Sequence, residues 1–150
     1  MSSLHDSFEI AASGVRAQSD RVRIHAHNMA NIGTPYFKRT IPVLTEGGGV
    51  TFSDMISTIQ RDGVLSMGIA ASPSGVMMEG GVQDPTDGQK IYQPDHPQAD
   101  KNGFVTLSNT EPMSEMAGAT IASRMYEANL SVISVVKQMA NKALEIGRGQ

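Results

Sequence analysis

The stretch FEIAASGVRAQSDRVRIHAHNMA, residues 8–30, decides the fold of this chain. Its large apolar residues recur at every seventh position, as Phe8, Val15, Val22 and Met29. A seven-residue apolar spacing keeps one narrow seam of a helix facing a partner helix, as in a coiled coil. The pattern therefore predicts one long helix from about residue 3 to residue 31, which Gly33 and Pro35 end.

The other end of the chain repeats this pattern in MYEANLSVISVVKQMANKALEI, residues 125–146. Here the seam consists of Met125, Val132, Met139 and Ile146, and it predicts a second long helix from about residue 110 to residue 146. Both helices far exceed the mean of about 11–12 residues in globular proteins. We therefore expect them to form a coiled-coil-like pair and also to contact neighbouring chains through these eight seam residues.

Residues 33–112 hold every proline and most of the glycines, a composition that breaks helices. Short apolar runs between turn signals predict a small β-rich insert. The fold class is then mainly α with a small β insert: residues 1–33 and 109–147 form a terminal helical domain, and residues 34–108 are inserted. The expected strands cover 36–44, 64–70, 90–92 and 104–107; residues 50–61 read as strand or short helix, and turns are expected at Asp62-Gly63, Gly80-Gly81 and Asn102-Gly103.

Composition excludes several classes of function. The formal charge of −3 and the absence of a basic run argue against nucleic-acid binding. No run approaches the roughly 18 apolar residues of a membrane span, and the N-terminus lacks the pattern of a cleavable secretory signal. The chain has no cysteine, which excludes disulfides and thiol catalysis. Four phenylalanines, three tyrosines and no tryptophan leave little for a single large core.

The histidines do not predict a metal or catalytic site. His25 and His27 lie about 200° apart around the expected helix, so they cannot share an ion, and both are expected to face solvent. Asp95, Asp100 and Asn102 lack the alternating ligands and final Glu of a calcium loop, and a turn explains them better. No nucleophile motif is present. We therefore expect no cofactor and no enzymatic activity.

The sequence resembles a known family at both ends. IAASGVRAQS at residues 10–19, followed by Asn28-Met29-Ala30-Asn31 and Thr34-Pro35-Tyr36, is similar to the start of flagellar rod, hook and hook-associated proteins. Members of that family begin with a long helix that ends in an Asn-x-Ala-Asn motif. ASRMYEAN at residues 122–129 and Lys137-Gln138-Met139 resemble the other end of the same family.

A third segment resembles the proximal rod members of that family. YQPDHPQADKNGFV, residues 92–105, is similar to their signature Tyr-x-Pro-x-His/Asn-Pro-x-Ala-Asp-x-x-Gly-Tyr-Val. The matching positions include Tyr92, Pro94, Pro97, Asp100 and Gly103, and Phe104 stands in place of the usual tyrosine. The resemblance covers roughly residues 4–40 and 76–147. Residues 41–75 do not match the family pattern.

The resemblance implies a structural subunit of the proximal rod of the flagellar basal body. Its terminal helices would assemble into a tube that surrounds an export channel and transmits torque. It would be exported through the type III apparatus without signal cleavage and located in the rod within the cell envelope. Implied partners are other rod proteins, the basal-body adaptor and MS ring, and the export gate. The alternatives are another flagellar axial component or a type III secretion needle-like subunit and, from another class, a small enzyme built on the insert.

Two further expectations concern residues outside the seam and the isolated chain. Asn28 and Asn31 are expected to serve the turn at the end of the first helix, since asparagine tolerates left-handed geometry and bonds nearby backbone. The terminal helices are expected to be partly disordered in the monomer, because exposed seams do not offset the entropy of ordering.

Overall fold

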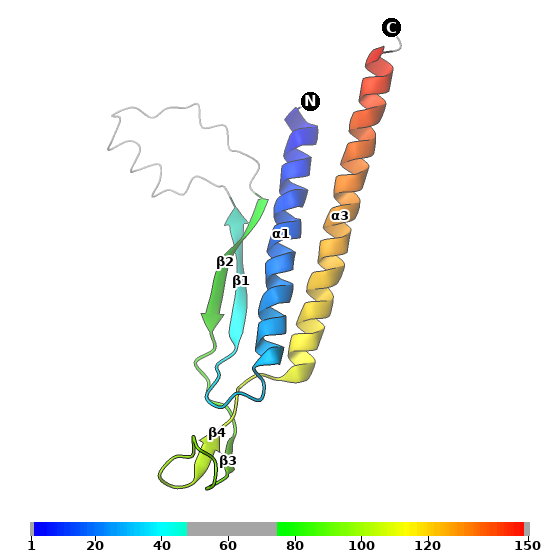
Figure 1. Cartoon of the computed structure of the whole chain (residues 1–150). Helices are drawn as coiled ribbons and strands as arrows, with labels where there is room; N and C mark the ends of the chain where they lie inside the picture. The colour runs from blue at the N-terminus through cyan, green and yellow to red at the C-terminus, as the bar shows by residue number, and fades with distance from the viewer. Residues whose placement is uncertain (1, 48–74, 149–150) are drawn as a thin grey trace, which may run out of the picture.

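The computed structural model of the chain describes residues 2–47 and 75–148 (Figure 1). Helix α1 (Ser2–Ala30) is followed by strands β1 (Thr40–Gly47), β2 (Gly75–Gln83), β3 (Lys90–Tyr92) and β4 (Phe104–Thr106), and helix α3 (Pro112–Arg148) ends the described part. The two helices lie side by side and antiparallel, so that both chain termini lie at one end of the molecule (Figure 1). The prediction of a mainly helical fold with a few strands between two terminal helices is confirmed.

Both helices begin and end close to the predicted positions. At the end of α1 the backbone N–H of Asn31 reaches the carbonyls of His27 and Asn28, and Thr34 N donates to Asn31 O. Pro112 opens α3, where a missing N–H costs no intrahelical hydrogen bond. No helix in the described part of the chain is long and apolar enough to cross a membrane.

Strands β1 and β2 form an antiparallel ribbon that packs along α1 (Figure 1). The predicted turn at Gly80-Gly81 is wrong, because both glycines lie inside β2. The register passes from Val43–Gly80 to Leu44–Met78, which leaves Glu79 without a partner residue as a β-bulge. Gly80 takes φ +110°, a left-handed geometry that glycine adopts without strain, so the glycines that suggested a turn serve the bulge.

Strands β3 and β4 form a separate hairpin at the end of the helix pair opposite the chain termini (Figure 1). Tyr92 pairs with Phe104 and Ile91 pairs with Val105, whose side chain is buried. This confirms the strands predicted at residues 90–92 and 104–107. The strand predicted at 64–70, the turn at Asp62-Gly63 and the ambiguous segment 50–61 lie outside the described residues.

Candidate functional site

The contact between α1 and α3 is made of small and polar residues. Six buried positions follow heptad spacing: Ala11, Gln18 and His25 lie seven residues apart on α1, and Glu115, Ala122 and Val136 lie seven and fourteen residues apart on α3, each no more than 9% exposed. These positions lie beside the predicted seams. Five of the six are small or polar, with Val136 the exception, so a search for large apolar residues misses most of them.

Two glycines let the helices approach closely along this contact. A Cβ atom on Gly14 would lie 2.7 Å from Nδ2 of Asn129, and one on Gly118 would lie 2.6 Å from Nε2 of His25. Real Cβ atoms essentially never come so close to another heavy atom. The helix pair is therefore held together by close backbone approach and polar contacts, with little apolar area buried between the helices.

The large apolar side chains face outward. On α3 the predicted seam residues Met125, Val132, Met139 and Ile146 are 51%, 46%, 54% and 77% exposed. On α1, Phe8 and Met29 are also exposed, whereas Val15 and Val22 are half-buried. The four α3 residues are therefore open to solvent over about half of their surface or more in the free chain. Their role as contacts to other subunits stays a prediction.

The exposed apolar surface of α3 is broader than the predicted seam. It also includes side chains at both ends and in the middle of the helix: Met113, Met116, Ile121, Leu130, Val135 and Leu144. Covering a large apolar side chain stabilises by about 1.5–3 kcal/mol relative to leaving it in water. Several large apolar side chains exposed on one helix are typical of a surface at which proteins associate.

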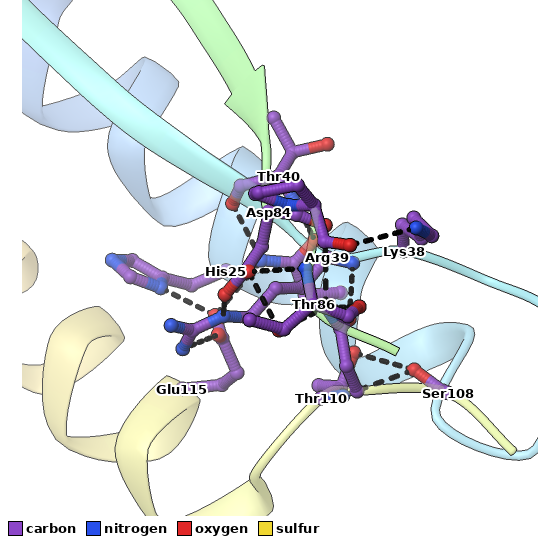
Figure 2. Close-up of polar contacts among 12 residues, drawn as sticks. His25, Lys38, Arg39, Thr40, Asp84, Thr86, Ser108, Thr110 and Glu115 are labelled. Carbon is purple, nitrogen blue, oxygen red and sulfur yellow. Dashed lines mark hydrogen bonds and ion pairs between the residues drawn. The ribbon is translucent and has the colours of Figure 1, made fainter. Parts of the chain in front are cut away.

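A polar junction joins the lower ends of the two helices to the ribbon, with Glu115 at its centre (Figure 2). The Glu115 carboxylate lies 2.7 Å from Nδ1 of His25, accepts a 3.0 Å hydrogen bond from Nδ2 of Asn28, and lies 3.7 Å from Nη1 of Arg39. Three separate segments of the chain therefore meet at one buried carboxylate. Removing it would leave buried donors without an acceptor.

The expectation that His25 faces solvent is wrong, since only 8% of it is exposed. Gly118 has no side chain, and the imidazole fills the space beside it. Among the described residues, His25 Nε2 is a buried nitrogen without a hydrogen-bond partner.

Asn28 does not serve the turn that was predicted for it. It is fully buried, and its side-chain amide donates to the carbonyl of Thr40 at 2.8 Å while its side-chain oxygen accepts the Thr40 N–H at 2.9 Å. The side chain thus binds the first residue of β1 as a neighbouring strand would. Asn31 does lie in the turn, where its amide donates to His27 O and its oxygen accepts from the Thr34 hydroxyl.

Arg39 extends the junction to the segment that follows β2. Its Nε donates to Asp84 at 2.8 Å, and its backbone N–H donates to Oδ1 of Asn109 at 2.7 Å (Figure 2). The hydroxyl and the backbone N–H of Thr86 also donate to the Asp84 carboxylate. These Thr86 hydrogen bonds, followed by that of Arg39, lower the pKa of Asp84 from its ordinary value of 3.8 to about 2.

The signature segment, residues 92–105, folds the hairpin loop. Gly103 takes φ +80°, and the Asp100 carboxylate accepts the backbone N–H groups of Phe104 and Asn102. The hydrogen bond from Phe104 is the main cause that lowers the pKa of Asp100. The rings of Tyr92 and Phe104 meet edge to face, 5.3 Å apart. Asp100 and Gly103 therefore shape the loop, while Tyr92, Pro94 and Pro97 are exposed.

Pro35 leads into the residue that attaches this hairpin to the end of α1. Tyr36 has φ +60°, its N–H donates to Thr106 O at 2.9 Å, and its hydroxyl donates to Gln98 O at 3.1 Å. No group of three His, Cys, Asp or Glu that could hold a metal ion occurs in residues 2–47 and 75–148.

The sequence is similar to known proteins along its whole length. Residues 101–146 match the family model described as flagellar basal body rod FlgEFG protein C-terminal. The flagellar basal-body rod protein FlgC of Buchnera aphidicola subsp. Baizongia pistaciae is 32% identical over 97% of this chain and 99% of the relative. The FlgC proteins of Bacillus subtilis and Salmonella typhimurium are each 30% identical, over 99% and 94% of this chain and 100% and 96% of the relative.

Proposed function

The chain belongs to the family of flagellar basal-body rod proteins named FlgC, and we propose that it forms part of the wall of the proximal rod through its two terminal helices. The family is one of structural proteins of the basal body. In the proposal, residues 1–33 and 109–147 form the axial core domain, and residues 34–108 form an insert at its periphery.

The observation that carries the proposal is the distribution of side chains around the helix pair. Alanine, glycine and buried polar groups lie between α1 and α3, whereas Met125, Val132 and Met139 are about half exposed. A self-sufficient globule places its large apolar residues inside. A subunit that is completed by its neighbours keeps them on its surface.

The proposal extends to the finer mechanism of assembly. Staggered helices of adjacent rod subunits cover each other's apolar faces, and the coiled-coil-like pairs close into a stiff tube. Phe8, Val15, Val22 and Met29 contribute from α1, and Met125, Val132, Met139 and Ile146 contribute from α3. The tube surrounds the export channel and transmits motor torque, and it contacts the basal-body adaptor, the MS ring and the export gate at its base.

Substitution of one exposed seam residue tests the proposal. Val132→Asp places a charge that would be buried without a partner at a subunit contact, yet Val132 is 46% exposed in the free chain. The purified variant should keep its helix content by circular dichroism but fail to enter isolated basal bodies, and cells should lose motility.

Two control variants separate assembly from folding. Val132→Leu keeps an apolar side chain and should assemble. Val136→Asp buries a charge against α1, where Val136 is 9% exposed, and should lower helix content in the free chain. Normal incorporation of Val132→Asp, or a loss of helix content in that variant equal to that of Val136→Asp, would contradict the proposal.

A further inference from the structure

The end of the molecule opposite the chain termini carries a group of exposed aromatic and proline side chains. Tyr36, Tyr92 and Phe104 are 52%, 65% and 40% exposed, and Pro94 and Pro97 are exposed beside them. We call these five residues the aromatic tip. Two of the seven aromatic residues of the chain, Tyr92 and Phe104, thus lie on a small hairpin, and a third, Tyr36, is bonded to it from the segment that follows α1.

Hydrogen bonds fix the aromatic tip in one conformation. Gln93 N donates to Gly103 O at 2.8 Å, and the Asp100 carboxylate caps the two backbone N–H groups of the turn. Tyr36 OH donates to Gln98 O, which holds the proline loop against the segment that follows α1. A rigid aromatic surface loses little conformational entropy when it binds, so this tip is prepared for contact with a partner.

The end that carries both termini offers the opposite shape. There the first turns of α1 and the last turns of α3 leave an open cleft of about 890 Å³ between them, and α3 continues beyond the start of α1 (Figure 1). Apolar side chains line it, including Leu4, Phe8, Ala140 and Leu144. Its ionisable lining residues are His5 and Lys137. We call it the terminal cleft.

We propose that the aromatic tip seats in the terminal cleft of the next subunit along the rod, a subunit with the same open end between two terminal helices. The inference rests on the proposed function, since it requires a rod. Aromatic anchors in apolar pockets supply most of the energy of protein interfaces. Asp95 is exposed on the loop of the tip, and its charge complements Lys137 beside the cleft.

The position of the two surfaces explains why the contact builds a shaft. They lie at opposite ends of an elongated molecule (Figure 1). A contact between two different surfaces of a subunit leaves one of each surface free on every pair. Unless the rotation between subunits closes a ring, further subunits therefore add along an axis. In this arrangement the outward face of α3 provides the lateral contacts, whereas Phe8 and Leu144, which line the cleft, belong to the axial contact.

A photo-crosslinking amino acid at position 92 of the full chain, expressed in cells that assemble flagella, tests the contact. Crosslinked peptides from purified basal bodies should map to a rod subunit within the first two turns of its N-terminal helix or the last three turns of its C-terminal helix. The same amino acid at position 130, on the outward face of α3, should map elsewhere. Crosslinks from position 92 to the middle of a helix, to a ring protein or to nothing would overturn the inference.

Substitution of the same residue gives a second readout. Tyr92→Ala should lower the amount of the chain in basal bodies at least tenfold, whereas Tyr92→Phe should keep it near the wild-type level. Equal incorporation of Tyr92→Ala and wild type would overturn the axial contact. It would leave the proposed function intact, because that function is tested by the Val132→Asp variant and does not depend on position 92.

Discussion

Gly118→Ala should destabilise the helix pair, although alanine is the better helix former. In an exposed helix interior the exchange stabilises by about 1 kcal/mol. Here the new Cβ would lie 2.6 Å from Nε2 and closer still to Cε1 of the buried His25 ring. Overpacking of this kind costs about 1–3 kcal/mol. Displacing the ring from Glu115 leaves buried polar groups unpaired, at about 1–3 kcal/mol more. Less the gain in helix propensity, the expected net loss is about 1–5 kcal/mol.

Urea unfolding of the purified chain, followed by far-UV circular dichroism, measures this loss. Gly147→Ala is the matched control, because Gly147 also lies in α3 but a Cβ there meets nothing within 4 Å; it should be neutral or slightly stabilising. In a His25→Ala background, where the ring is gone, Gly118→Ala should become stabilising by about 1 kcal/mol. A Gly118→Ala variant as stable as wild type would refute the close contact between α3 and His25.

Three further perturbations test the polar junction and the hairpin. Glu115→Ala should destabilise by about 1–3 kcal/mol, because it leaves the buried donors of His25 and Asn28 without an acceptor, and Glu115→Gln should cost less in the same unfolding assay. The folded-state pKa of Asp84 is depressed to about 2, so the contribution of Asp84 to stability is present above about pH 4 and is lost as the pH falls from there toward 2. Asp84→Asn should flatten that part of the plot of stability against pH. An unchanged plot would contradict the contacts of Asp84 with Thr86 and Arg39. Gly103→Ala should strain the backbone at φ +80° by about 1–2 kcal/mol. It should also change the near-UV circular dichroism of Tyr92, because the new Cβ would lie 2.9 Å from the Tyr92 ring. An unaltered near-UV spectrum would argue against the described turn.

The sequence predicted both long helices because their apolar residues recur with a helical period. It did not predict which face of each helix meets the other. The large residues Met125 and Val132 define the most conspicuous heptad, but the heptad of Glu115, Ala122 and Val136 is the one buried against α1. Small and polar residues give a weak hydrophobic signal, so only the three-dimensional packing shows that contact.

The polar junction could not be read from spacing, because its members are far apart in the sequence. His25 and Glu115 are separated by 90 positions, and Asn28 reaches Thr40 across the end of α1. Glu115 lies seven residues before Ala122, on the same face of α3. A charged residue on a buried helix face requires a partner, so this spacing could have predicted a polar contact there. The hairpin was easier to predict, because Asn102-Gly103 and the flanking strands are local features.

The central claim is that the apolar face of α3 is open in the free chain and covered in the rod. Because the chain has no cysteine, a single Cys at position 132 or 139 reports the exposure of that face to a thiol reagent, with Ala122→Cys as a position that is buried within the chain itself. The account predicts rapid labelling of positions 132 and 139 in the purified chain, protection of both in isolated basal bodies, and slow labelling of position 122 in both. Equal labelling of positions 132 and 139 in the free and the assembled protein would contradict it.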